Sequence, residues 1–203
     1  MNALVLIDIQ NDFLPGGSLA VREGDAVIPV ANALSRSGRF DLVVATQDWH
    51  PANHGSFAAN HRGRRPGDTI ELRGRTQILW PAHCVQNTPG AELAPGLDRS
   101  RIARVFPKGT DPQIDSYSGF FDNGHLKATG LGDYLRERKV TDLTLLGLAT
   151  DYCVKFTALD ARQLGFAVAL VPEGCRAVDV KPGDGVRAVD EMRAAGVTLA
   201  TRG

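Results

Sequence analysis

Short runs of apolar residues recur along the chain and indicate buried strands. Residues 3–7 are apolar without alternation, and an acidic residue, Asp8, ends the run. Runs of this kind are typical of strands that are covered on both faces, as in a parallel sheet. We predict strands at 3–7, 42–45, 104–106, 143–146, 167–171 and 197–199, of which 104–106 has the weakest pattern.

Segments between these runs have the spacing of amphipathic helices. The pattern predicts helices over about 26–36 and 131–138, a third that stops at Gly165 and a fourth that stops at Gly196. Three of them begin beside residue types that cap helix N-termini, so we expect side-chain caps from Asp25, from Thr150 or Asp151, and from Asp184.

Strands that alternate with helices predict a doubly wound α/β fold, with a mostly parallel six-stranded sheet and helices on both faces. The 203 residues suffice for one well-buried core, so we expect a single domain over 1–203. Residues 50–104 have almost no periodicity, and a loop of this length is usually functional. Ligands in such folds bind beyond the carboxyl ends of the strands, so polar residues at those ends are the candidates for function.

Composition narrows the class of protein further. Hydrophobic residues make up 43% of the chain and charged residues 23%, and 23 basic residues cancel 23 acidic ones. These values exclude a disordered chain, a fibrous repeat and a membrane bundle, and they favour neither a nucleic acid nor a membrane as partner. The first residues lack the basic region of a signal peptide, and three cysteines are too few for a disulfide framework. We therefore expect a cytoplasmic protein, either a monomer or a homo-oligomer.

One group of candidate residues has the chemistry of metal ligands. Asp48 and His50 follow the second predicted strand, and His83 lies within 50–104. Residues i and i+2 of an extended segment share a side, so Asp48 and His50 can bind one cation. Carboxylate and imidazole ligands suit Zn²⁺, Fe²⁺ or Mn²⁺. An Asp-x-His pair is nevertheless a weak motif, and scattered surface histidines explain it equally well.

A second group has the chemistry of nucleophilic catalysis. Cys153 falls in the first turn of a predicted helix, where the helix dipole lowers the pKa of a thiol. Asp8 can take the thiol proton and Lys108, after the strand at 104–106, can stabilise the thiolate. Taken singly, the three have plain structural explanations: a turn aspartate, a solvated lysine and a small buried cysteine. Together they predict a cysteine hydrolase of the α/β class.

Over essentially its whole length, the chain resembles the nicotinamidases of the isochorismatase-like cysteine hydrolase superfamily. The segments around Asp8, Lys108 and Cys153 mark the superfamily. The combination of Gln-Asp-Trp-His at 47–50 with Trp-Pro-Ala-His-Cys at 80–84 is more specific for nicotinamidases. The resemblance rests on residues 7–13, 16–19, 45–50, 80–85, 108–109, 117–120 and 147–154.

The resemblance implies hydrolysis of nicotinamide to nicotinate and ammonia through a cysteine thioester, with pyrazinamide as a further substrate and a place in NAD salvage. Asp8 would serve as base and then acid, Lys108 would hold the ion pair, and Cys153 would be the nucleophile. The backbone N–H groups of Ala149 and Cys153 would bind the oxyanion. Relatives have a cis peptide bond before the residue that corresponds to Ala149.

The resemblance also implies a divalent metal ion, Zn²⁺ in the first place and Fe²⁺ or Mn²⁺ as alternatives, that binds the pyridine nitrogen. Asp48, His50 and His83 would hold it. His54, Ser56 and water are all candidates for a further ligand. The residues that resemble those around the substrate ring are Phe13, Trp80 and Tyr117.

Other functions remain open at this point. A sister amidase would act on another small amide or a carbamoyl compound, and a silent member of the superfamily would only bind a partner. A zinc hydrolase would use metal-bound water and leave Cys153 dispensable. A dinucleotide-binding fold is excluded, because no G-x-G-x-x-G turn follows the first strand.

Overall fold

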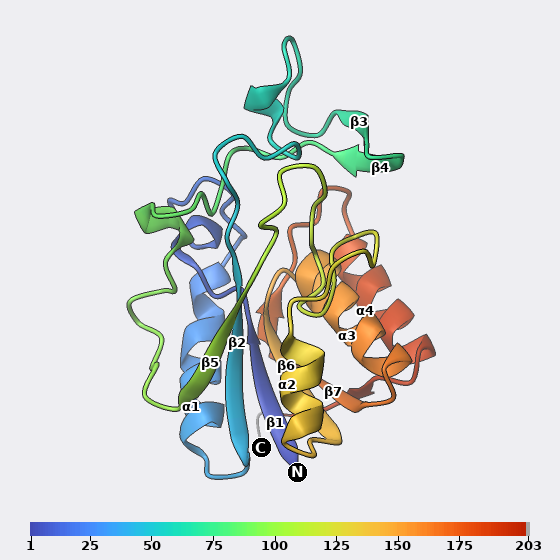
Figure 1. Cartoon of the computed structure of the whole chain (residues 1–203). Coiled ribbons are helices and arrows are strands. Elements are labelled where there is room, and N and C mark those ends of the chain that lie inside the picture. Colours follow the sequence, from blue (N-terminus) through green and yellow to red (C-terminus); the bar gives the residue numbers. More distant parts are fainter. Residues whose placement is uncertain (202–203) are drawn as a thin grey trace.

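Six parallel strands form the central sheet in the computed structural model, which describes residues 1–201 (Figure 1). Their order across the sheet is β5-β2-β1-β6-β7-β8. The strands span Asn2–Ile7 (β1), Leu42–Asp48 (β2), Ile102–Lys108 (β5), Asp142–Leu148 (β6), Ala167–Arg176 (β7) and Thr198–Leu199 (β8). All six predicted strands are present, and the predicted fold class is confirmed.

The apolar runs of the sequence correspond to the centre of the sheet. In β1 every residue after Asn2 is buried, and in β6 the run from Leu145 to Leu148 is buried. Helices cover both faces, so successive side chains are buried whichever way they point. The edge strand β8 has only two residues and both are exposed.

The four α-helices follow the strands in the predicted alternation. They span Val27–Arg36 (α1), Leu131–Glu137 (α2), Lys155–Gln163 (α3) and Asp184–Ala194 (α4). Figure 1 shows α1 on one face of the sheet and α2, α3 and α4 on the other. Shorter helices span Asn11–Phe13, Gly24–Ala26, Ala58–Asn60 and Pro89–Ala91 as 3₁₀ turns, and Thr150–Val154 as a π-helix. Within residues 1–201, no helix combines the length and apolar content that crossing a bilayer requires.

The predicted side-chain caps are wrong. The N-cap positions of α1, the π-helix and α4 belong to Ala26, Ala149 and Gly183, and none of these helix starts has a side-chain capping bond. The Asp151 carboxylate instead accepts hydrogen bonds from the backbone N–H groups of Val178 and Asp179, both at 2.9 Å. Asp151 therefore ties the segment after β7 to the segment after β6.

The long segment 50–104 contains a hairpin that was not predicted. Strands β3 (Thr69–Leu72) and β4 (Arg75–Ile78) pair antiparallel, and the hairpin lies beyond the sheet in Figure 1. Arg73 and Gly74 form its two-residue turn, and both have positive φ, 50° and 74°. A two-residue turn with glycine, after a strand that alternates exposed and half-buried residues, is a hairpin signal that the sequence did contain.

The direction in which successive strands are added to the sheet reverses between β1 and β6. The connection after β1 uses α1 on one face, and the connection after β6 uses α3 on the other (Figure 1). The carboxyl ends of β1 and β6 therefore border the crevice in which doubly wound folds bind ligands. Asp8 follows β1 and the π-helix with Cys153 follows β6, while Asp48 and Lys108 end β2 and β5.

Candidate active site and metal centre

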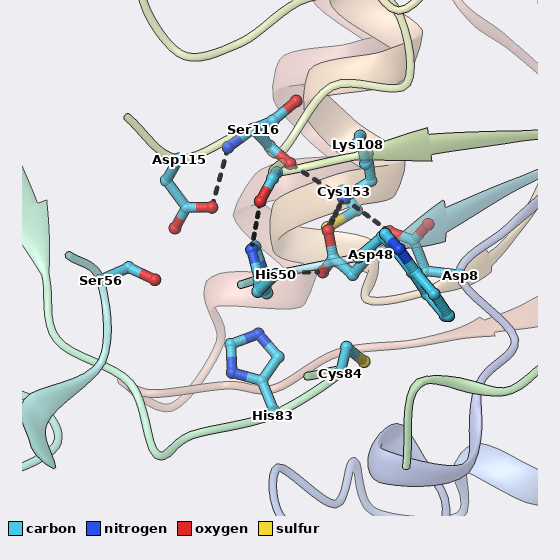
Figure 2. A network of polar contacts seen from close by, with 12 residues as sticks. Asp8, Asp48, His50, Ser56, His83, Cys84, Lys108, Asp115, Ser116 and Cys153 are labelled. Atoms are coloured by element: carbon cyan, nitrogen blue, oxygen red, sulfur yellow. Dashed lines mark hydrogen bonds and ion pairs between the residues drawn. The ribbon is translucent and has the colours of Figure 1, made fainter. Parts of the chain in front are cut away.

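Lys108 is the centre of the predicted catalytic cluster. Its side chain is wholly buried, and its Nζ lies 2.9 Å from Asp8 Oδ2 and 3.4 Å from Cys153 Sγ (Figure 2). Because the three residues follow or end β1, β5 and β6, the parallel sheet brings their side chains to one edge. The structure thus brings together Asp8, Lys108 and Cys153, as the sequence predicted.

The hydrogen bonds of Lys108 leave one carboxylate oxygen without a donor. Its ammonium group donates to Asp48 Oδ1 at 2.5 Å, to the Ser116 carbonyl at 2.9 Å and to Cys153 Sγ at 3.4 Å. Asp8 Oδ2 is close to the ammonium but has no hydrogen-bond partner among the described residues. A carboxylate oxygen of Asp8 and the Cys153 sulfur lie within 4.8 Å of each other, so the Asp8 carboxylate is placed to accept a proton.

Burial sets the protonation behaviour of Asp8. The side chain is completely buried, and its Oδ1 accepts a hydrogen bond of 2.6 Å from the Thr46 hydroxyl. Burial raises the pKa of Asp8, the Lys108 cation opposes this rise, and the Asp48 carboxylate adds to it. A carboxylate with a raised pKa is a stronger base than an exposed one, and this is the property that deprotonation of a thiol requires.

Asp48 provides the charge that keeps Lys108 protonated. Burial opposes ionisation of both groups. The Lys108 and His50 charges nevertheless hold the pKa of Asp48 well below its usual range. In return, the Asp48 and Asp8 carboxylates raise the pKa of Lys108. The site therefore contains a permanent ammonium–carboxylate pair between Lys108 and Asp48, and Asp8 is the group whose protonation state can change.

The predicted low pKa of the Cys153 thiol is wrong. Cys153 lies within the first turn after Ala149, as expected, but it is buried. Burial raises the pKa of Cys153 well above its usual range; Lys108 lowers it, and the Asp8 and Asp48 carboxylates raise it further. Loss of water around the sulfur is the largest cause and outweighs the Lys108 charge, so the resting side chain is a thiol and needs a base.

The backbone before Cys153 has the geometry that the resemblance implies. The peptide bond between Leu148 and Ala149 is cis. Ala149 and Cys153 line one cavity, and the π-helix begins directly after Ala149. Both residues are therefore next to the space in front of the sulfur.

Asp48, His50 and His83 form the predicted metal-binding group. All three are buried, and one donor atom from each lies within 4.8 Å of the others. The Nδ1 atom of His50 contacts the Gly109 carbonyl at 2.9 Å, and that of His83 contacts the Pro81 carbonyl at 2.8 Å. A ring nitrogen that bonds a carbonyl carries the hydrogen, so Nε2 of each ring has the lone pair that a metal needs.

The charge state of His83 also suits metal binding. Burial lowers the pKa of His83 to about 4, and the charge of His50 contributes to the decrease. For His50, burial is outweighed by the Asp48 carboxylate, which raises the pKa. His83 is therefore neutral near pH 7, which is the form that binds metal ions.

A buried nitrogen without a partner distinguishes the two candidates for a further ligand. Among the described residues, His54 Nε2 has no hydrogen-bond partner, whereas the Ser56 hydroxyl bonds His54 Nδ1 at 2.7 Å. Donor atoms of His50, His54 and Asp115 lie within 4.8 Å of one another. A metal ion in this space would give the buried His54 nitrogen a partner, with the ring oriented by Ser56. Asp115 was missed, because it neither follows a strand nor belongs to a motif that a single sequence reveals.

The cavity in front of Cys153 has mostly aromatic and apolar walls. Phe13, Trp80 and Tyr117 line it, as the resemblance implies, next to Asp48 and His83. Sequence reasoning missed four further wall residues, Leu19, Asp115, Tyr152 and Val178. The combination of flat apolar walls, a metal-binding group and a thiol suits a small aromatic substrate.

The hairpin holds two of these walls in place through Gln77. The Gln77 amide in β4 donates to the Tyr117 hydroxyl and to Asp115 Oδ2, both at 3.1 Å. The Trp80 indole N–H donates to the same hydroxyl at 3.2 Å. Burial raises the pKa of Tyr117, so the phenol stays neutral.

Comparison with known proteins places this site in a family. The isochorismatase domain matches residues 2–202 of the chain. The chain belongs to the isochorismatase family. Among family members, the nicotinamidase of Escherichia coli K12 is 54% identical over 201 residues, which are 98% of this chain and 94% of that protein. The family resemblance expected from the sequence is thus confirmed.

Solved structures of the isochorismatase family agree with this assignment. A nicotinamidase/pyrazinamidase of Acinetobacter baumanii superposes with a TM-score of 0.95 at 45% identity, covering 99% of this chain and 96% of that one. A pyrazinamidase of Pyrococcus horikoshii, in complex with zinc, superposes with a TM-score of 0.81 at 39% identity, covering 98% of each chain.

Proposed function

We propose that this isochorismatase-family chain hydrolyses nicotinamide to nicotinate and ammonia, and also hydrolyses pyrazinamide. The observation that carries the proposal is the contact of Asp8, Lys108 and Cys153 beside the buried donors of Asp48, His50 and His83. The similar nicotinamidases and pyrazinamidases support it. The reaction returns a pyridine ring to NAD salvage.

One divalent metal ion completes the site in this proposal. Asp48, His50 and His83 hold it, with His54 as a further ligand, and the unpartnered buried nitrogen of His54 supports this fit. Zinc is the ion that we propose, because two or three imidazoles with a carboxylate suit it and a similar structure contains it. When bound, the ion supplies a Lewis acid for the pyridine nitrogen of the substrate.

The walls of the cavity orient the substrate ring. Phe13 and Trp80 flank the ring, and Tyr117, fixed by Trp80 and Gln77, closes one side. A ring anchored at its nitrogen beside Asp48 and His83 directs its carboxamide toward Cys153, which lines the same cavity. Positioning of this kind makes the attack effectively intramolecular.

Acylation begins with transfer of the Cys153 thiol proton to Asp8 Oδ2. The sulfur then bonds to the amide carbon, and the carbonyl electron pair moves to oxygen. Backbone N–H groups of Ala149 and Cys153 bind this oxyanion, and such donors contribute about 3 kcal/mol each. When the C–N bond breaks, Asp8 returns the proton to the departing nitrogen. Ammonia leaves, and a thioester remains on Cys153.

Deacylation uses the same carboxylate. Asp8 takes a proton from water, the oxygen attacks the thioester carbon, and the C–S bond breaks. Asp8 then returns the proton to sulfur. Lys108 stays protonated through both steps because Asp48 balances its charge, and its hydrogen bond to Cys153 Sγ stabilises the thiolate as it forms.

We also place the reaction in the cytoplasm. Cys84, Cys153 and Cys175 are all free thiols, as is usual for a protein in a reducing compartment. The small amide is then the only partner that the proposed reaction requires.

Ammonia release by the purified protein tests the proposal, with metal content measured on the same sample. We expect turnover of nicotinamide and pyrazinamide, and little release from small carbamoyl compounds, which lack a ring nitrogen for the metal. Preference for a carbamoyl compound would favour the sister amidase instead. No release from any amide would contradict the proposal altogether.

A further inference from the structure

The carboxylate of Asp8 receives a short hydrogen bond from a residue outside the predicted site. Thr46 Oγ1 donates to Asp8 Oδ1 at 2.6 Å, and both side chains are fully buried. A hydroxyl has one hydrogen, so the Thr46 hydroxyl donates its single hydrogen bond to Asp8. Thr46 lies in β2, two residues before Asp48, and is absent from the residues that line the substrate cavity.

The other branch of the Thr46 side chain fixes the direction of its hydroxyl. The Thr46 Cγ2 methyl packs against Gly119, where an added Cβ would come within 2.8 Å of it. Gly119 is itself held on both sides: its N–H donates to Thr157 Oγ1 at 2.8 Å, and its carbonyl accepts from the Thr129 hydroxyl at 2.6 Å. A β-branched side chain has few rotamers, and this contact leaves the hydroxyl facing Asp8.

The two oxygens of Asp8 consequently have different roles. Oδ1 accepts the bond from Thr46, whereas Oδ2 lies 2.9 Å from Lys108 Nζ and has no hydrogen-bond partner among the described residues. We propose that Thr46 is a positioning residue that fixes the Asp8 carboxylate, so that Oδ2 takes the proton of the Cys153 thiol. The inference rests on the proposed function and adds the group that orients its base.

Two substitutions separate the hydroxyl from the shape of the side chain. Thr46→Val keeps the branched shape and removes the donor, whereas Thr46→Ser keeps the donor and removes the methyl. Because a hydrogen bond to a charged group is stronger than a neutral one, we expect Thr46→Val to lower kcat for nicotinamide about ten- to a hundredfold. KM should stay within about twofold, because Thr46 does not line the cavity, and Thr46→Ser should keep most of the kcat.

Two controls exclude a purely structural effect. Thr144→Val makes the same chemical change in β6, well before the carboxyl end of that strand, and should leave kcat unchanged. Thermal unfolding and metal content, measured on every variant, correct the rates for the folded fraction. Thr46→Ala serves as a second variant without the donor if Thr46→Val does not fold.

Alkylation of Cys153 by iodoacetamide tests the same step without nicotinamide, because it also requires loss of the thiol proton. We expect Thr46→Val, but not Thr46→Ser, to slow alkylation of the Cys153 peptide, followed by mass spectrometry. Unchanged kcat and alkylation in Thr46→Val would overturn the inference, and so would equal losses in both variants or a change confined to KM. A wild-type protein that releases no ammonia would contradict the proposed function, and alkylation would still decide the role of Thr46.

Discussion

Asp48 Oδ1 lies 2.5 Å from Lys108 Nζ, while Asp48 Oδ2 lies 3.7 Å from His50 Nε2. One carboxylate therefore joins the catalytic cluster to the metal-binding group (Figure 2). Loss of the metal and loss of the lysine's counter-charge are coupled through this residue, so substitutions at Asp48 and at His83 should have different kinetic effects.

We predict that Asp48→Asn loses the metal and lowers kcat, whereas His83→Asn loses metal and mainly raises KM. Asp48→Asn also removes the negative charge that balances Lys108, and breaking such a buried pair lowers the free energy of unfolding by about 3 kcal/mol. Metal analysis, kcat, KM and urea unfolding of both variants provide the comparison. Equal kcat values in the two variants would show that Asp48 has no role beyond binding metal.

The unpartnered nitrogen of His54 predicts unequal effects at the two candidates for a further ligand. We expect His54→Ala to weaken zinc binding more strongly than Ser56→Ala. Ser56→Ala removes only the group that orients the His54 ring, and we expect it to weaken zinc binding about tenfold or more. Competition with a chelator of known affinity measures both constants. If Ser56→Ala has the larger effect, Ser56 rather than His54 is the ligand.

Gln77 connects the hairpin to the walls of the cavity, so we predict that Gln77→Leu raises KM for nicotinamide with little change in kcat. The substitution removes one donor from the Tyr117 hydroxyl and the Gln77 donor from Asp115 Oδ2. Gln163→Leu, at the exposed end of α3, is the matched control. A fall in kcat at constant KM would show that Gln77 acts on the chemistry instead.

The stability of the metal-free protein should depend on pH through His83. Burial is the first cause that lowers the pKa of His83, from an ordinary value of 6.5 to about 4. Between about pH 4 and pH 6.5, His83 therefore binds a proton in the unfolded chain but not in the folded chain. Stability is full above pH 6.5 and decreases as the pH falls toward 4, by about 3 kcal/mol in total.

His50 has a raised pKa and acts in the opposite direction, so the test compares variants. We expect His83→Gln to show a shallower loss of unfolding free energy between pH 7 and pH 4 than the unsubstituted protein, in urea titrations with chelator present. Parallel curves would mean that His83 does not titrate on unfolding.

The sequence predicted the elements and the residues at strand ends, because these depend on local patterns. Apolar runs located all six strands of the sheet, and the parallel order then placed Asp8, Lys108 and Cys153 at one edge. The caps and the thiol pKa were wrong for a different reason. Asp151 bonds a distant segment, and burial raises the pKa of the Cys153 thiol. Both effects depend on tertiary contacts.

A single sequence has no local pattern that identifies residues acting through long-range contacts. Asp115 lies in an irregular segment and comes together with His50 and His54, and Thr46 reaches Asp8 from the neighbouring strand β2. The hairpin at 69–78 is different, because its alternation and its Arg73-Gly74 turn were present in the sequence and were overlooked.

Substitution of the nucleophile tests the account most directly. Cys153→Ala removes the sulfur and leaves every proposed metal ligand, whereas Cys175→Ala removes a buried thiol outside the site. Measurement of ammonia release from nicotinamide, together with metal content, should show no turnover and full metal in Cys153→Ala, and near-native turnover in Cys175→Ala. Near-native turnover by Cys153→Ala would contradict the thioester and favour attack by metal-bound water.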